Sequence, residues 1–448
     1  MRSRSFLTKG LLVACACACA SIASCAGFDT ERIAGRSDAI TSNEAEIIDF
    51  TFETEVLADD SVTTRRSIVR QLLYAQGILR LTSNASGQIG NVELPSVVES
   101  AGPGDKKRVR YKAILPVAWP KKEPLPSSYE LQLPRDATGL ARFNRKYDGY
   151  CGLSEHGQEN FWHDWNPRAR DCRVDPADVI RVRASIAPHE KAEATKYPEY
   201  DRIWEDDRLD VVAIFGVIES NDAQDWGYTE AQRFIEWTSQ QLKDVNVAPH
   251  RSGRSILADT TITGTATVGG RSRDVKIDVF VVGMIAQAGP DFDKRYDPLS
   301  ERADLILYNG HAQLGANTNA LGRKGKVLPG KYQLVVLNGC ESFALVDTAM
   351  TDRRRDVNGA DDPDGTRFLD VITNAKPGYA NNLANVSYLV YKAALLADTP
   401  VSYTRLIGKM PEAHVIVVWG EEDNRFQPAI SFRHHPAVFE QQSFVFDF

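Results

Sequence analysis

Short apolar runs separated by helix-like sequence are the feature that most constrains the fold of this chain's second half. Such runs occupy 210–216, 305–308, 334–337 and 415–418, and helical patterns lie between most of them, notably at 229–242 and 383–396. Strands that are apolar on both sides are typical of a parallel sheet covered by helices on both faces. The sequence therefore predicts an α/β domain over 206–430, built on a mainly parallel sheet.

A hairpin is expected within this domain. Residues 262–268 and 275–282 are strand-like and flank Gly269-Gly270. Two strand-like runs around a pair of glycines are typical of an antiparallel hairpin. The second arm is apolar enough to continue into the core.

The preceding region, 46–205, has a different pattern and is predicted to be an α+β domain. Residues 47–56 alternate between apolar and polar, which favours a strand, and 63–80 carry an apolar stripe at helical spacing. Strands are expected near 109–117 and 129–133, between proline-rich turns. The sequence assigns no function to this region.

The N-terminus has the pattern of an export signal. Positive charges precede an apolar segment at 11–23, which is shorter than the roughly 20 residues that a membrane-spanning helix needs. The segment ends in Ile22-Ala23-Ser24-Cys25, which resembles the lipobox of bacterial lipoproteins. The resemblance implies acylation of Cys25 and an exported protein tethered at the cell envelope, at the outer membrane in a Gram-negative host.

A plain cleavable signal is the alternative for the same segment. In either case, 1–24 form the signal peptide, 25–45 a small, polar, flexible tether, and 431–448 a C-terminal tail. The sequence holds no second apolar stretch long enough to span a bilayer, so the lipid is the expected membrane contact. The formal net charge of −7 argues against nucleic acid as a partner.

Three cysteines remain once the signal is removed and Cys25 carries the lipid. In an oxidising compartment, Cys151 and Cys172 are expected to form a disulfide. Closing that loop of about 20 residues is worth roughly 3 kcal/mol in the chain-entropy model. Cys340 is then an unpaired thiol, which is either buried and inert or kept for chemistry.

Two metal sites are weaker alternatives to a protein without cofactors. Zinc ligands are present in the set Cys151, His156, His163 and Cys172, but their spacing matches no common zinc motif. The acidic segment Asp356–Asp364 is rich in oxygen ligands for calcium but lacks the EF-hand spacing and its terminal glutamate.

Two residues with catalytic chemistry follow neighbouring apolar runs. The run at 305–308 leads into Asn309-Gly310-His311, and the run at 334–337 leads into Asn338-Gly339-Cys340. If the two strands are parallel and adjacent, their ends lie about 5 Å apart. A thiol beside an imidazole is the pairing that cysteine-dependent acyl transfer uses.

These two blocks resemble the motifs of the caspase-like cysteine peptidases, a group that includes gingipains, clostripain and CHAT domains. The resemblance covers about 206–425. It implies a caspase-like fold, peptide or protein substrates, Cys340 as nucleophile, and His311 as the residue that passes the proton to the leaving amine. It also implies an oxyanion hole from the backbone N–H of Cys340 and of Ala312.

One position departs from the family pattern, because Ala312 stands where glycine usually follows the histidine. Alanine resists the positive φ that glycine permits. The sequence therefore favours a lipid-anchored cysteine endopeptidase. The alternative is a catalytically silent caspase-like module that binds partners or acts as a scaffold.

Overall fold

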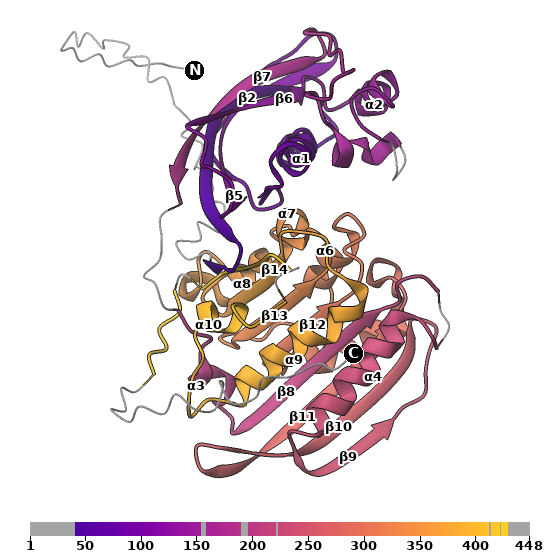
Figure 1. The fold of residues 1–448 in the computed structure, drawn as a ribbon, viewed down its shortest axis with the longest axis vertical. Helices are drawn as coiled ribbons and strands as arrows, with labels where there is room; N and C mark the ends of the chain where they lie inside the picture. The colour runs from indigo at the N-terminus through magenta and orange to yellow at the C-terminus, as the bar shows by residue number, and fades with distance from the viewer. Residues whose placement is uncertain are drawn as a thin grey trace, which may run out of the picture. The chain divides into compact units, whose positions relative to one another are not determined.

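Two β-sheets, each with its own apolar core, organise the chain (Figure 1). The computed structural model describes residues 41–153, 158–189, 196–220, 223–411, 414–421 and 423–428, which belong to one compact unit. The predicted signal peptide, the predicted lipidation site Cys25, most of the predicted tether and the tail 431–448 lie outside the described residues. Among the helices that the structure describes, none combines the length and apolarity needed to cross a bilayer.

The smaller sheet belongs to the N-terminal region and is antiparallel in its strand pairs. Its strands run in the order β3-β5-β2-β7-β6, with β4 also paired to β5. Helix α1 packs its apolar stripe against this sheet, so the predicted α+β organisation is confirmed. The elements are β2 (Ala45–Asp59), α1 (Thr64–Ser83), β3 (Ser86–Gly87), β4 (Glu93–Ala101), β5 (Lys106–Pro120), β6 (Ser128–Pro134), α2 (Leu140–Tyr147), η1 (Gln158–Asp164) and β7 (Val179–Pro188).

The predicted disulfide between Cys151 and Cys172 is present, with 4.7 Å between the two Cα atoms. Both cysteines are buried in the core of the smaller sheet, where Trp165 packs against several aromatic rings. Because each sulfur is bonded to the other, neither is available as a zinc thiolate. Of the two histidines in the zinc alternative, His156 lies outside the described residues.

The larger sheet is mixed, whereas the sequence predicted a mainly parallel one. Its order is β1-β15-β14-β13-β12-β8-β11-β10-β9, and the central strands from β14 to β11 are parallel. Antiparallel pairs add β15 and β1 at one end and β10 and β9 at the other. The strands are β1 (Thr41–Ser42), β8 (Arg208–Gly216), β9 (Lys243–Pro249), β10 (Ile256–Val268), β11 (Arg271–Val282), β12 (Leu305–Asn309), β13 (Gln333–Asn338), β14 (Leu369–Asn374) and β15 (Ile416–Trp419).

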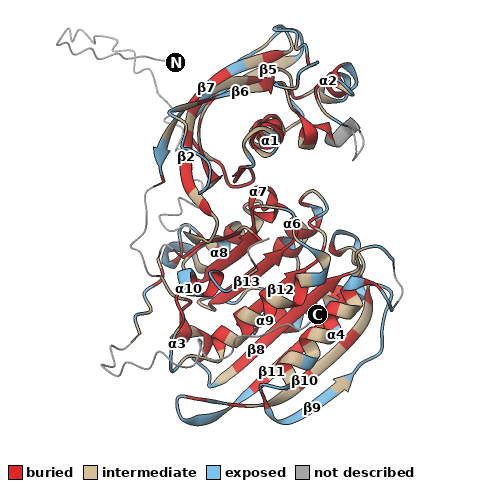
Figure 2. Ribbon diagram, in the orientation of Figure 1, coloured by how far each residue is buried: buried red, intermediate tan, exposed pale blue. Residues whose placement is uncertain are grey.

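Helices cover the larger sheet on both faces. Helices α4, α9 and α10 bury their apolar sides on one face, and α5, α6 and α8 bury theirs on the other. The central strands are buried along their length (Figure 2), which is why they appear in the sequence as uninterrupted apolar runs. The helices are α3 (Tyr200–Ile203), α4 (Trp226–Ser239), α5 (Pro290–Ser300), α6 (Ala316–Arg323), α7 (Ser342–Leu345), α8 (Ala349–Asn358), α9 (Leu383–Ala394) and α10 (Tyr403–Ile407), with single 3₁₀ turns η2 (Ile285–Gln287), η3 (Gly359–Asp361) and η4 (Ala380–Asn382).

The hairpin expected around Gly269-Gly270 is formed by β10 and β11, and β11 continues into the core beside β8. Two boundaries differ from those drawn on the sequence. The end of the predicted tether is ordered, because Thr41–Ser42 pair with β15. Residues 196–205 belong with the larger sheet, since Trp204 packs in its core and donates its indole N–H to the carbonyl of Ala394.

Candidate active site

The two motif-bearing strands are neighbours, as predicted. Strands β12 and β13 pair in parallel, with Asn309 opposite Asn338. The turns that follow them touch at the backbone, because the N–H of Gly310 donates to the carbonyl of Asn338 at 3.1 Å. Gly339 packs so closely that an added Cβ would lie 3.0 Å from the carbonyl oxygen of Gly310. The turns carrying His311 and Cys340 therefore lie together at the carboxyl edge of the sheet.

A buried row of amides fixes the ends of these strands. Asn338 donates to the side chain of Asn309 at 3.0 Å, and Asn374 at the end of β14 donates to Asn338 at 2.7 Å. Ser387 of α9 completes the row by donating to Asn309 at 3.0 Å. Oδ1 of Asn374 has no hydrogen-bond partner among the described residues, but the bonds of the row link the ends of β12, β13 and β14, from which both turns start.

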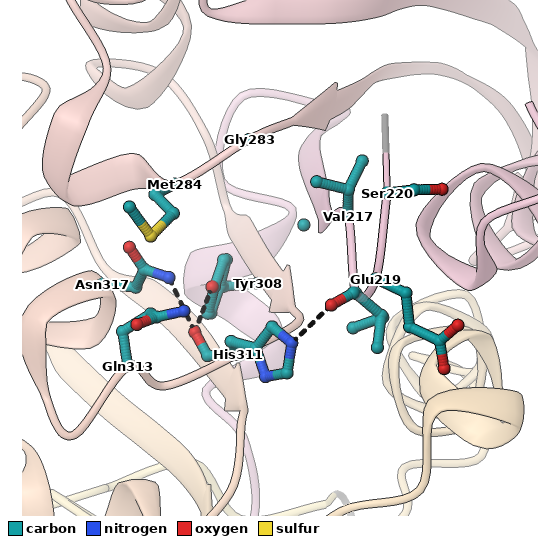
Figure 3. A pocket seen from close by; sticks show the side chains of 11 residues that line it. Val217, Glu219, Ser220, Gly283, Met284, Tyr308, His311, Gln313 and Asn317 are labelled. Carbon is teal, nitrogen blue, oxygen red and sulfur yellow. Dashed lines mark hydrogen bonds between the residues drawn. The ribbon is translucent and has the colours of Figure 1, made fainter. Parts of the chain in front are cut away.

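The imidazole of His311 is held in one orientation by a backbone carbonyl. Its Nε2 lies 2.9 Å from the carbonyl oxygen of Ile218, in the loop that follows β8 (Figure 3). A carbonyl only accepts hydrogen bonds, so Nε2 carries the proton of the neutral ring. The lone pair is then on Nδ1, which is the ring atom that can accept a proton from a nucleophile.

The loop that supplies this carbonyl is itself fixed by Asp225, at the N-cap of α4. The carboxylate accepts backbone N–H groups from Ile218, Glu219 and Ser220 at 2.7 to 3.1 Å, and another from Gly227. Burial opposes ionisation of Asp225, but these N–H donors outweigh it and hold the pKa of the carboxyl below its usual range. No motif in the sequence marks Asp225 as part of the site.

The backbone of His311 is fixed on its other side. Its carbonyl accepts a hydrogen bond from the hydroxyl of Tyr308 at 2.6 Å and one from the amide of Asn317 at 2.9 Å (Figure 3). Tyr308 and Asn317 both line the cavity beside the imidazole. The residue is therefore held at its ring and at its main chain.

Cys340 is partly buried, and its Sγ lies 4.0 Å from the carbonyl oxygen of Gly378. Burial raises the pKa of the Cys340 thiol, and the charge of Glu341 raises it further. Within the described residues, no hydrogen bond joins Cys340 to His311. The turns are brought together as predicted, but the two side chains each have another partner in this state.

The position that departed from the family pattern is accommodated without strain. Positive φ occurs at Gly310, Gln313 and Leu314 but not at Ala312, so alanine fits the turn. No backbone hydrogen bond from the N–H of Ala312 or of Cys340 to another described residue is formed. The N–H of Cys340 interacts with its own thiol, and Ala312 is 2% exposed.

A cavity of about 260 Å³ adjoins the imidazole. It opens between the loops that follow β8, β11 and β12 (Figure 3). Its volume lies just below the range of about 300–1,000 Å³ that is typical of small-molecule sites. The lining residues are Gly216, Val217, Ile218, Glu219, Ser220, Gly283, Met284, Tyr308, His311, Gln313 and Asn317.

A second imidazole near the thiol escaped the sequence analysis. His414 is buried, and neither of its ring nitrogens has a hydrogen-bond partner among the described residues. Burial lowers the pKa of His414. A Cβ added at Gly378 would lie 3.6 Å from its ring, which places His414 on the side of Gly378, the residue whose carbonyl faces Cys340. It follows no apolar motif, so no signal in the sequence marks it.

The acidic segment Asp356–Asp364 forms the end of α8 and the turn after it. Asp362 is buried and accepts hydrogen bonds from the side chain of Asn358 and the backbone of Arg367. Over the part of the chain that the structure describes, no group of three or more potential metal ligands comes together.

Comparison with models of known protein families and with characterised proteins finds no match to this sequence.

Proposed function

We propose that this protein is an exported, lipid-anchored cysteine endopeptidase with a caspase-like catalytic domain. The observation that carries the proposal is the pairing of β12 with β13, which end in Gly-His and Gly-Cys at the same sheet edge. The orientation of the His311 ring supports it, because Nδ1 remains free to act as a base. The disulfide supports export, since such bonds are typical of oxidising compartments.

The reaction would follow the chemistry of these groups. Sγ of Cys340 attacks the peptide carbonyl carbon while its proton passes to Nδ1 of His311. The N–H groups of Cys340 and Ala312 stabilise the oxyanion, a contribution of about 3–4 kcal/mol per donor in measured hydrolases. The imidazolium then protonates the leaving amine, and water attacks the thioester with His311 again accepting the proton.

A catalytically silent scaffold is the second candidate, and one observation favours it. Burial and Glu341 both raise the pKa of the thiol, so the resting cysteine is neutral. A neutral thiol needs His311 as a general base at the moment of attack, and hydrogen bonds of this kind often tighten only when substrate is bound. A scaffold would need no such step.

Alkylation of Cys340 by iodoacetamide in the full chain separates the two candidates. A base acting on the thiol contributes about 10²–10⁴ in rate, so His311→Ala should slow labelling by a large factor at neutral pH while the protein stays folded. Hydrolysis of a peptide library should vanish in both Cys340→Ala and His311→Ala. Labelling that occurs only after denaturation would leave the scaffold as the function.

His414→Ala is the matched control, because it removes a second imidazole near the thiol. Labelling should continue at the parental rate in this variant. If His414→Ala slows labelling and His311→Ala does not, the assignment of the base is wrong.

The membrane anchor needs its own test, because Cys25 lies outside the described residues. Cys25→Ser should move the protein from the membrane fraction to the soluble fraction or leave its signal uncleaved. A variant that fractionates with membranes as the parent does would contradict lipidation.

A further inference from the structure

A carboxylate directly follows the candidate nucleophile, and the smaller-sheet region supplies its partners. Glu341 is 2% exposed. Its Oε1 lies 3.7 Å from Nε of Arg80 in α1, and its Oε2 lies 3.6 Å from Nδ1 of His163 in η1. Its own N–H donates to the carbonyl of Lys376 at 3.2 Å. Segments far apart in the sequence thus converge on the residue after Cys340.

The backbone at Glu341 is in a conformation that depends on such support. Its φ is 51°, in the left-handed region that residues other than glycine rarely adopt. Such conformations persist where the surrounding structure fixes them. The contacts of Glu341 therefore help to determine how the adjacent Cys340 is presented.

Apolar packing ties the same loops to the smaller sheet. Ala312 follows His311, Ala344 and Leu345 lie shortly after Cys340, and the three belong to the apolar core of the smaller sheet. The N–H of Gly90 donates to the carbonyl of Ala344 at 3.1 Å. The segments that follow both candidate catalytic residues are thus anchored in the N-terminal region.

The charges around Glu341 matter for the thiol. Burial raises the pKa of Glu341 and outweighs the groups that lower it, which are Arg80 first, then a hydrogen bond from Gln76 and the charge of Lys376; Asp164 adds to the rise. Arg80 is shared, because its guanidinium also pairs with Asp164. The ammonium group of Lys376 donates a hydrogen bond to the side-chain oxygen of Asn84 at 2.6 Å. Burial lowers the pKa of Lys376 to about 8, so it holds its positive charge less firmly than Arg80 does.

Several described groups surround the Cys340 thiol: His414 lies on the side of Gly378, whose carbonyl faces the thiol, and the turn of His311 packs against the turn of Cys340. The thiol experiences the negative charge of Glu341, and it interacts with the buried hydroxyl of Tyr308. A neighbouring negative charge disfavours a thiolate, so whatever neutralises Glu341 favours ionisation of Cys340.

We propose that Arg80 is a positioning residue for the Cys340 nucleophile, acting through Glu341, and that the smaller-sheet region is thereby part of the catalytic apparatus. Arg80 holds Glu341 in its left-handed conformation and offsets its charge beside the thiol. This rests on the proposed function, but it can be tested without a substrate. It gives the N-terminal region a role that neither its composition nor its fold suggests.

The test is the pH dependence of iodoacetamide labelling of Cys340 in the full chain. Arg80→Met should move the midpoint of the rate–pH profile upward by roughly one unit, the size expected for an uncompensated charge nearby. Glu341→Gln should move it downward. In the double variant, Arg80→Met should have no further effect, because its target charge is gone. Arg66→Met, on the exposed side of α1, is the matched control and should leave the profile unchanged.

An unchanged profile in Arg80→Met would overturn the proposal, and so would an Arg80→Met shift that persists in the Glu341→Gln background. If Arg80→Met fails to fold, the Arg80→Met/Glu341→Gln double variant takes its place, because it has no buried unpaired carboxylate. Its rate–pH profile should match that of Glu341→Gln alone, and a difference between the two would overturn the proposal. Failure of the proposed function is distinguishable, because it would appear as an absent effect of His311→Ala.

Discussion

The carboxylate of Asp225 accepts a hydrogen bond from the backbone N–H of Glu219 at 2.7 Å, and this contact secures the loop whose carbonyl orients His311. The same carboxylate caps α4 through Gly227. One side chain therefore links the start of a helix to the direction in which an imidazole points.

Asp225→Ala should lower the free energy of unfolding by about 1–2 kcal/mol, the usual cost of removing an N-cap. It should also slow alkylation of Cys340, since the Ile218 carbonyl is no longer held against Nε2. Because the pKa of Asp225 is depressed in the folded state, its stabilisation is present above the unfolded pKa of about 3.9 and is lost as the pH falls through the folded pKa.

Denaturant titration at neutral pH and in acid measures this contribution. Asp225→Asn is the matched variant, because asparagine also caps helices but cannot satisfy as many N–H groups. It should keep most of the stability and lose part of the labelling rate. Equal labelling in the parent and both variants would contradict the role assigned to this loop.

The central strands could be predicted because their environment is uniform. Strands β12 and β13 are apolar up to the Asn-Gly at which they end, so the sequence predicts that they are adjacent and that the candidate site lies at their ends. The sequence does not predict strand β14, because Asp370 and Thr373 interrupt its apolar run. In the folded chain Thr373 donates to the carbonyl of Val417, and Oδ2 of Asp370 accepts from the buried tyrosines Tyr332 and Tyr403.

The wider site was beyond sequence analysis for a different reason. Arg80 belongs to the region of the smaller sheet and Glu341 to the region of the larger sheet, so no local sequence pattern encodes the contact between them. The same holds for the carbonyl that orients His311, since a backbone atom has no residue-type signature. Sequence could place the turns of His311 and Cys340 together but not the direction of either side chain.

Gly339→Ala should disrupt the site. The added Cβ would lie 3.0 Å from the carbonyl oxygen of Gly310 and 3.1 Å from the N of Ala312. Those atoms have little freedom, because the turn is hydrogen-bonded on both sides of His311. We expect a loss of about 1–2 kcal/mol in unfolding free energy, at the lower end for overpacking, and slower labelling of Cys340.

Gly283→Ala is the control for this change. No atom lies within 4 Å of a Cβ built at Gly283, so the variant should be as stable as the parent. If calorimetry finds the two alanine variants equally stable, the close approach of the two turns does not limit which residue can occupy position 339.

Removing the disulfide should cost about 3 kcal/mol in the chain-entropy model. The double variant Cys151→Ala/Cys172→Ala avoids leaving a stray thiol in the buried core of the smaller sheet. Denaturant unfolding should show the loss in the variant, and adding a reductant should destabilise the parent but not the variant. If the reductant destabilises the parent and the variant equally, its effect does not come from the disulfide between Cys151 and Cys172.

Strand β14 carries a buried acid, Asp370. Asp370 is fully buried and accepts hydrogen bonds from Tyr332 at 2.5 Å and from Asn424 at 2.7 Å. Burial outweighs these bonds and raises the pKa of Asp370 to about 7. A raised carboxyl pKa means that the folded protein holds a proton that the unfolded chain releases. The contribution of Asp370 to stability should therefore fall as the pH rises from about 4 to about 7.

Asp370→Asn tests the sign of this effect, because the amide is a neutral group of the same shape. The unfolding free energy of the variant should decline less than that of the parent over this pH window. Asp347→Asn is the control, since it makes the same substitution at a partly exposed carboxylate that is paired with Arg323. If the parent and Asp370→Asn lose stability in parallel between about pH 4 and 7, the carboxyl of Asp370 is ionised in the folded protein and its tyrosine and asparagine donors outweigh its burial.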